Sequence, residues 1–432
     1  MLSNEVLRKK TKKNMIQKQR GTIDILPGES EVWQWMENKI KETAALYGYS
    51  EIRLPTFESS ELYKRGVGET SDVVQKEMYS FEDNDRRSIT LRPEGTAGVV
   101  RSVIENGLAS GAMPLPLYYL ISCFRYEKPE AGRSREFYQF GVEQFGAENP
   151  AADANVISLG YDIFKNLGLD VSLEINSIGC RHCRPIYHKA LHDYFESCKD
   201  DLCETCLDRL DKNPLRILDC KSPVCSEYAK NAPKTIDYLC PDCKKHLDEL
   251  KVYLDRAGIK YNVNPKIVRG LDYYQRTVFE FISEDIGSKS TICGGGRYDG
   301  LVEELGGPRL PGIGFAMGLT RVMLALKSAN KIPEFDTAPA LYIASMGDSA
   351  RLKSFEMSLA FKKHGLNVTF DQVGRSLKAQ MKYADKTGAK FSLVLGDSEL
   401  EAGKATLKNM ANGETVEVDI NDISDIVDKM QN

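Results

Sequence analysis

The spacing of apolar residues predicts a series of helices and strands in the first part of the chain. Apolar residues recur at helical spacing over residues 29–47, and helices are also predicted over 96–104 and 151–168. Short strands are predicted over residues 51–55, where a proline ends the pattern, and over 171–175.

The most informative pattern lies between these elements. Residues 117–146 predict two strands of aromatic and β-branched residues, joined by a charged connection over 127–136. Because side chains alternate across a strand, Gln139, Gly141 and Glu143 share one face of the second strand. Such a row does not bury an ordinary core, so we predict that this face forms the floor of a site. The alternative is a solvated hairpin at a sheet edge.

Four cations accompany this hairpin. Arg125 lies where the first strand ends, and the connection adds Lys128, Arg133 and Arg135. Guanidinium groups suit the oxygens of a polyphosphate or a nucleic-acid backbone. We therefore expect the hairpin to bind a phosphorylated ligand.

A second candidate site lies at the turn between a strand ending at Arg92 and the helix that begins near Thr96. Glu94 and Thr96 place oxygen acceptors beside free backbone N–H groups at this turn. A carboxylate held there could accept hydrogen bonds from the ammonium group of a ligand. The alternative is that Thr96 only caps the helix.

Cysteines are concentrated in one helical stretch. Nine of the eleven fall between Cys180 and Cys243, and eight of these form the close pairs Cys180/Cys183, Cys203/Cys206, Cys220/Cys225 and Cys240/Cys243. Two C-x-x-C corners can together supply a tetrahedral site of four thiolates. We predict a structural zinc ion bound by the second and fourth pairs. Spacing leaves the other pairs open, and reduced thiols at helix starts are the alternative.

Three runs after this stretch point to ligand binding. Residues 277–282 predict a strand, and Arg269, Tyr273 and Tyr274 precede it. Residues 293–305 predict a glycine-rich turn that leads into a helix.

The third run, residues 311–326, predicts a helix with Gly314, Gly318 and Arg321 on one face. A helix face without side chains could take a flat base, and the arginine could bind a phosphate. The alternative is close packing of another helix across the glycines.

After a linker over residues 327–339, buried strands alternate with helices and predict a small α/β domain. The 432 residues predict about two to four domains in all. The 58 basic and 62 acidic residues give a net charge of -4, so a global basic field for nucleic acid is excluded, whereas local patches for tRNA are not. No apolar run reaches the length of about 18 residues that a membrane span needs, and we expect a cytoplasmic protein without disulfides.

The runs TLRPEGTA, FRYEKPEAGRSREFYQFGVEQFG, RGLDYYQRTVFEF, GGGRYDG and GIGFAMGLTR resemble histidyl-tRNA synthetases, which are class II aminoacyl-tRNA synthetases. The resemblance covers nearly everything after Met15, and the RGLDYY and GGGRYD runs are its histidine-specific signatures. It implies an α+β fold in which an antiparallel catalytic sheet of six strands carries a mostly helical insertion and is followed by an α/β anticodon-binding domain. The implied division is an extension over 1–14 that we expect to be disordered, catalytic parts over 15–178 and 263–330, the insertion over 179–262 and the anticodon-binding domain over 331–432.

The resemblance also implies an activity and its residues. The family joins histidine to ATP as an adenylate, with Mg²⁺ on the ATP, and passes the histidyl group to tRNA(His), working as a homodimer. By similarity, Arg125 and Arg269 act on the α-phosphate. Further ATP contacts are implied for Arg133, Gly314, Gly318 and Arg321, and histidine contacts for Glu94, Thr96, Gln139, Glu143, Tyr273, Tyr274 and Tyr298.

A related family offers the main alternative. Its members regulate ATP phosphoribosyltransferase as histidine sensors and usually lack the phosphate-binding arginines and the anticodon-binding domain. Arg125, Arg133, Arg321 and residues 340–430 are all present in this chain, which favours the enzyme.

The usual start of the synthetase family aligns near Met15, so residues 1–14 are a departure from that family.

Overall fold

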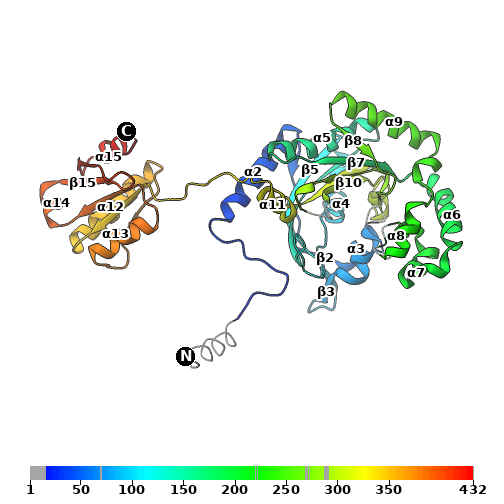
Figure 1. Cartoon of the computed structure of the whole chain (residues 1–432), viewed down its shortest axis with the longest axis horizontal. Helices are drawn as coiled ribbons and strands as arrows, with labels where there is room; N and C mark the ends of the chain where they lie inside the picture. The colour runs from blue at the N-terminus through cyan, green and yellow to red at the C-terminus, as the bar shows by residue number, and fades with distance from the viewer. Residues whose placement is uncertain are drawn as a thin grey trace. The chain divides into compact units, whose positions relative to one another are not determined.

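The computed structural model describes residues 16–68, 71–218, 220, 222–267, 271, 273–286 and 291–431 (Figure 1). The predicted disordered extension and Arg269 lie outside this part of the chain. Two compact units are present, Met1–Pro333 and Glu334–Asn432. In the described residues no helix combines the length and the apolar character that crossing a membrane requires.

The first unit is built on an eight-stranded sheet. Six central strands run antiparallel, and the short edge strands β1 and β8 pair in parallel with β5 and β7. The order across the sheet is β1 (Ser50–Glu51), β5 (Leu115–Phe124), β6 (Glu136–Phe145), β11 (Gly312–Gly318), β10 (Thr291–Arg297), β9 (Gln275–Ile282), β7 (Ser172–Ser177), β8 (Tyr261–Val263). This confirms the expected α+β fold with an antiparallel catalytic sheet.

The two faces of this sheet bury different sets of side chains. One face packs its aromatic residues, among them Phe140 and Phe315, against four helices. These helices are α2 (Ser30–Leu46), α5 (Pro150–Asn166), α9 (Pro241–Arg256) and α11 (Leu319–Ser328). The other face carries Tyr119, Tyr273 and Tyr298 and packs against α4 (Thr96–Glu105) and α10 (Leu301–Glu304). The second face holds the candidate site.

A small antiparallel sheet and one helix lie beside α4. The sheet has the order β2 (Phe57–Ser59), β4 (Ser88–Leu91), β3 (Tyr79–Glu82), and α3 (Ser60–Val67) follows β2. Arg92, which directly follows β4, is buried and donates to the carbonyl oxygens of Leu54, Pro55 and Ser122. The strand end that leads to Glu94 is therefore fixed to the large sheet.

The cysteine-rich stretch is helical, as predicted. Its helices are α6 (Cys183–Glu196), α7 (Glu204–Lys212), α8 (Pro223–Lys230) and α9. They leave the large sheet after β7 and return to it at β8. Figure 1 shows α6 to α8 grouped at one side of the unit, near α3. Arg209 on α7 forms an ion pair with Asp72 at 3.4 Å, which joins the insertion to the segment after α3.

Two predicted elements are wrong. The helix expected over 311–326 is the strand β11 followed by α11, and the glycine turn expected at 293–296 lies inside the strand β10. The spacing of Gly314 and Gly318 fits a helix, but it also fits a strand. Ile313, Phe315 and Met317 alternate with small residues, and their burial on one face of the sheet decides in favour of the strand.

The second unit has its own five-stranded sheet, which confirms the expected α/β domain. The strand order is β13 (Val368–Phe370), β12 (Leu341–Ser345), β14 (Phe391–Leu395), β15 (Lys404–Asn409), β16 (Thr415–Asp419). The first three strands are parallel and the last two antiparallel. Its helices are α12 (Asp348–Lys363), α13 (Leu377–Lys386), α14 (Asp397–Ala402) and α15 (Ile423–Gln431).

Candidate active site

A cavity of about 330 Å³ opens on the sheet face that carries the tyrosines. Strands β6, β10 and β11, the turn before α4 and the connection between β5 and β6 all contribute to its wall. Nine of the residues predicted from the sequence line it, namely Glu94, Thr96, Arg125, Arg133, Gln139, Tyr273, Tyr274, Gly318 and Arg321. The fold therefore brings together predicted site residues that lie up to about half of the chain apart in the sequence.

Glu94 and Thr96 occupy the turn between β4 and α4. The two carboxylate oxygens of Glu94 accept hydrogen bonds from the backbone N–H groups of Thr96, at 2.7 Å, and Ala97, at 2.9 Å. Glu94 thus satisfies the start of the helix, so Thr96 is not the cap. Burial raises the pKa of Glu94, and these two hydrogen bonds oppose the shift. The carboxylate remains at the cavity wall, where it could also accept from a cationic ligand.

Glu143 lies behind this wall and is 1% exposed. One of its oxygens accepts from the hydroxyl of Thr96 at 2.6 Å, and the other accepts from the hydroxyl of Tyr298. Burial raises the pKa of Glu143 to about 8, against the effect of these two hydrogen bonds. Glu143 and Tyr298 do not line the cavity themselves but fix the position of Thr96, which does.

Gly141 makes room for a tyrosine that the sequence prediction missed. Tyr119 stands opposite Gly141 in the β5–β6 ladder, and a Cβ atom on Gly141 would lie 2.2 Å from its ring. The hydroxyl of Tyr119 lies 3.5 Å from Glu143. The position of Tyr119 could have been predicted from the strand pairing, because a glycine between two polar residues of one strand face leaves space for the side chain across from it.

Tyrosine rings form the side of the cavity nearest to Glu94. Tyr273 and Tyr274 precede β9, and their ring centroids lie 4.6 Å apart. Tyr273 also meets Tyr298 edge-on at 5.7 Å. All three rings are buried, and Tyr273 and Tyr274, which line the cavity, restrict this part of it to a ligand of limited size.

Three arginines line another part of the cavity. Arg125 donates to the carbonyl oxygen of Pro93 at 2.9 Å. Arg133 forms ion pairs with Glu127 at 3.2 Å and with Glu130 at 3.4 Å. Arg321 donates to the carbonyl oxygen of Thr291 at 2.7 Å, and burial followed by the charge of Arg133 lowers its pKa. The accumulated positive charge makes this part suitable for an anion.

The floor between the two parts is made of small residues. Gly294 on β10 and Ala316 and Gly318 on β11 line the cavity there. The predicted glycine surface is therefore formed by two paired strands and not by a helix. Gly314 does not line the cavity, since a Cβ atom on it would lie 2.1 Å from a carboxylate oxygen of Glu143.

The comparisons with known proteins identify the family. The family model described as histidyl-tRNA synthetase matches residues 21–185 and 225–322, and that of the anticodon binding domain matches residues 341–430. A histidine–tRNA ligase of Caldicellulosiruptor bescii is 50% identical over 418 residues, which are 96% of this chain and 99% of that protein. One of Acetivibrio thermocellus is 52% identical over 408 residues, or 94% of this chain and 98% of that protein.

The chain belongs to the histidyl-tRNA synthetase family.

A solved structure agrees with this result. The histidyl-tRNA synthetase of S. aureus, crystallised in its apo form, has a TM-score of 0.82 and 39% identity, and the match covers 97% of this chain and 100% of that one. The predicted family, the enzyme class and the anticodon-binding domain are confirmed. The match to the synthetase model omits residues 186–224, within the insertion.

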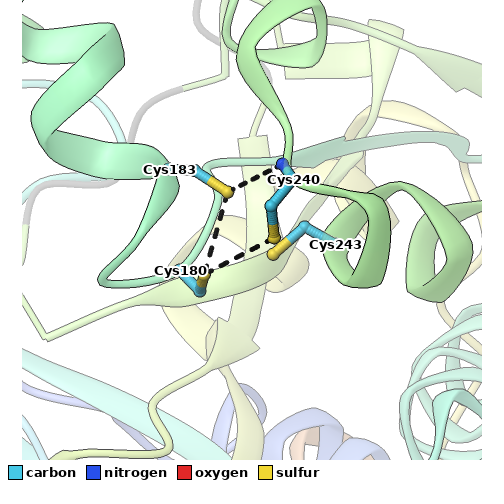
Figure 2. Close-up of side chains that lie close together, drawn as sticks. All are labelled: Cys180, Cys183, Cys240 and Cys243. Carbon is cyan, nitrogen blue, oxygen red and sulfur yellow. Dashed lines mark hydrogen bonds between the residues drawn. The ribbon is translucent and has the colours of Figure 1, made fainter.

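The predicted pairing of the cysteines is wrong. In the structure Cys180 and Cys183 face Cys240 and Cys243, as Figure 2 shows, while Cys203 and Cys206 face Cys220 and Cys225. The second and fourth pairs therefore do not share a site. Helix packing decides the partners, because α9 begins beside the turn that follows β7, whereas α7 begins beside α8.

Proposed function

We propose that this chain ligates L-histidine to tRNA(His) in two steps, through a histidyl-adenylate, and releases AMP and pyrophosphate. The observation that supports this most directly is the polarity of one cavity. Its tyrosine part carries the buried carboxylate of Glu94 for an amino acid, and its other part carries arginines for a polyphosphate.

The amino-acid part suits the ammonium and imidazole groups of histidine. Glu94 presents a carboxylate to the ammonium group, and Gln139 adds an amide beside it. Thr96, held by Glu143, keeps its position when the ligand enters. A site lined by fixed polar groups rejects isosteres that leave these groups unpaired, by up to about 10⁴-fold.

The reaction needs no nucleophile from the protein, because the carboxylate of histidine attacks the α-phosphate of ATP. Negative charge then accumulates on that phosphate, and cations aimed at it lower the barrier. We assign Arg125 to this phosphate, and Arg133 and Arg321 to the distal phosphates. Arg269, which lies outside the described residues, is assigned by family resemblance to the opposite side of the α-phosphate.

ATP enters as its magnesium complex, and its adenine lies on the small-residue floor. Gly294, Ala316 and Gly318 allow a flat base to approach the backbone of β10 and β11. Mg²⁺ offsets the charge of the phosphates that Arg133 and Arg321 bind. Positioning of the two substrates and electrostatic stabilisation of the transition state then account for the formation of the adenylate.

The unit Glu334–Asn432 is proposed to bind the anticodon of tRNA(His). A chain ending at Pro333, where the first compact unit ends, should keep the adenylation rate within about threefold and lose at least about 10²-fold in tRNA charging. Charging at the full rate by this shortened chain would contradict the assignment. The division into an extension, two catalytic parts, an insertion and this domain is part of the proposal.

A homodimer in the cytoplasm is the expected working form. Large apolar side chains are exposed before α2 (Leu26), at the end of α2 (Leu46) and on β2 (Phe57), and they are 62%, 84% and 56% exposed. A second copy covering them would remove this apolar surface from water. Analytical ultracentrifugation should give twice the mass of the chain.

Exchange of pyrophosphate into ATP tests the central proposal. Exchange that depends on histidine is expected from the enzyme and not from a histidine-sensing regulatory subunit. Histidine binding without exchange would favour the sensor. Exchange that depends on another amino acid would overturn the proposed specificity.

A further inference from the structure

Eight cysteines of the insertion form two groups that the active site does not use. The first group is Cys180, Cys183, Cys240 and Cys243, and the second is Cys203, Cys206, Cys220 and Cys225. Within each group all four sulfur atoms lie within 4.8 Å of one another. The four residues of each group come from two turns that are distant in the sequence, so folding and not only local spacing assembles them.

The distances between sulfur atoms indicate what the groups hold. Cys180 lies 3.7 Å from Cys183 and 3.9 Å from Cys240, and Cys203 lies 3.8 Å from Cys220. A disulfide requires about 2.05 Å. Zinc bonded tetrahedrally to four sulfur atoms at about 2.3 Å places those atoms about 3.8 Å apart. These three separations therefore match the edges of a tetrahedron around one ion.

Backbone N–H groups already point at these sulfur atoms. In the first group the N–H of Cys240 donates to Cys183 at 3.1 Å, across the two corners. In the second group the N–H of Cys203 donates to Cys225 at 3.2 Å, in the same crossed manner. Thiolates are much better acceptors than thiols, so this arrangement suits the charged form.

Each corner also lies at the start of a helix. Cys183 begins α6, Cys203 immediately precedes α7, Cys225 lies in the first turn of α8, and Cys240 immediately precedes α9. The positive end of a helix dipole stabilises a nearby thiolate. All four helices of the insertion therefore begin at a corner.

We propose that each group binds one structural zinc ion through four thiolates, so that the insertion holds two. On binding, the four thiols of a group release their protons to solvent, and the closed shell leaves no coordination position for a substrate. The two sites differ in what they join.

The first site holds the point where the insertion leaves the catalytic sheet. Gly179, with φ +71°, turns the chain into Cys180, and its carbonyl oxygen accepts from the N–H of Arg276 on β9 at 2.8 Å. Arg184, one residue after Cys183, donates to the carbonyl oxygen of Tyr274 in the cavity wall. The first site is thus only a few residues from the tyrosine part of the active site.

The other corner of the first site is equally well anchored. His246, three residues after Cys243 on α9, lies 2.7 Å from Asp153 on α5. Asp153 also accepts from Thr277 on β9 at 2.6 Å and pairs with Arg297 on β10 at 2.5 Å. The ion in the first site would therefore tie together two corners that are both bonded to the sheet.

The second site lies in the core of the insertion itself. Cys206 and Cys225 are buried there with Leu210 and Ile217. Arg209 on α7 links this region to the rest of the unit through its ion pair with Asp72. Loss of this site should loosen α7 and α8 while leaving the active site in place.

Metal analysis of the full chain, purified without added metal, tests the two sites. Elemental analysis by mass spectrometry should find about two zinc ions per chain. X-ray absorption at the zinc edge should give four sulfur neighbours at about 2.3 Å around each ion. Iron in place of zinc, a nitrogen or oxygen shell, or less than half an ion per chain would overturn the proposal. These measurements need no variant that could misfold.

Paired substitutions then separate the sites. Cys180→Ser with Cys240→Ser, and Cys203→Ser with Cys220→Ser, replace only half-buried ligands and should each lower the zinc content by about one ion. Cys198→Ser is the matched control, because this cysteine of the insertion belongs to neither group, and it should retain both ions. Equal zinc content in all three variants would contradict the assignment.

The difference between the sites predicts a difference in activity, and this part depends on the proposed function. The first paired variant should lose about 10²-fold in histidine-dependent pyrophosphate exchange, whereas the second should stay within about threefold. Equal losses would show that the first site does not support the histidine pocket. If the wild type exchanges no pyrophosphate, the proposed function fails while the zinc count still stands.

Discussion

The two ends of the cavity are built in opposite ways. At the tyrosine end, Glu94 and Glu143 are 3% and 1% exposed, and their partners are backbone N–H groups and buried hydroxyls. At the arginine end, the side chain of Arg133 is 35% exposed and pairs with glutamates of its own connection. One end is fixed before a ligand arrives, whereas the other holds cations whose present partners a phosphate can replace.

This difference suggests a division of labour between selection and catalysis. Buried polar groups that are already satisfied discriminate strongly, because a wrong ligand leaves them unpaired. Half-exposed cations discriminate weakly but respond to charge that develops on a phosphate. We therefore expect substitutions at the two ends to affect different kinetic constants.

Removal of Arg125 should have the largest effect. Arg125→Ala is expected to lower the rate of adenylation by about 10²–10³-fold with little change in the KM for histidine, because the cation acts on the transition state. Histidine-dependent pyrophosphate exchange at varied histidine concentrations measures both constants. Arg87→Ala is a matched control, since Arg87 is exposed and pairs with Asp83 outside the cavity. A rate within threefold of the wild type would remove Arg125 from the phosphate site.

Glu143→Gln should affect the other end. The carboxylate of Glu143 accepts from Thr96 through one oxygen and from Tyr298 through the other, whereas the amide of glutamine has only one acceptor oxygen. One of these two hydrogen bonds is therefore lost, and with it the support of the histidine part. We expect the KM for histidine to rise about 10–100-fold while the KM for ATP changes less than about threefold. Glu174→Gln, on β7 and outside the cavity, should change neither. Equal losses for both substrates would indicate a general structural role.

The same substitution predicts a dependence of stability on pH. Burial raises the pKa of Glu143 from its ordinary 4.5 to about 8. The stabilisation of the neutral form is complete below the ordinary value and is lost as the pH rises through the folded value. The Tm of the wild type should therefore fall relative to that of Glu143→Gln between pH about 5 and about 8. Parallel Tm curves would contradict the raised pKa.

Arg133→Ala should produce a smaller change at the arginine end. Its side chain is partly exposed, and solvent weakens the pairs it makes. The KM for ATP should rise about tenfold and that for histidine should not change. Arg309→Ala serves as the control, because it removes the exposed ion pair of Arg309 with Glu148. A larger effect on histidine than on ATP would place Arg133 at the wrong end.

Tyr298→Phe should have the smallest effect of the series. It removes one hydroxyl that donates to Glu143 while the ring still packs against Phe145 and Tyr273. We expect the KM for histidine to rise about threefold to tenfold, since one typical hydrogen bond contributes about 0.5–1.5 kcal/mol and packing is retained. A change in the KM for ATP alone would break the contrast between the two ends.

The polar strand face and the cations beside it follow from the order of the amino acids without any tertiary contact. The period of two along β6 placed Gln139 and Glu143 together whatever lay opposite them. The helix that begins at Thr96 and the helices that begin near Cys183 and Cys240 were also predictable, because local propensity favours them.

Tertiary structure alone decided what local spacing leaves open. Gly314 and Gly318 fit a helix and a strand equally well until β6 and β10 pair with β11 on both sides. The four cysteine pairs are nearly equivalent in spacing, and only the packing of α9 beside the turn after β7 joins Cys180 to Cys240. Glycines have no side chain that favours a helix or a strand, and one thiol pair looks like another. The segments that pack against them therefore determine their secondary structure and their grouping.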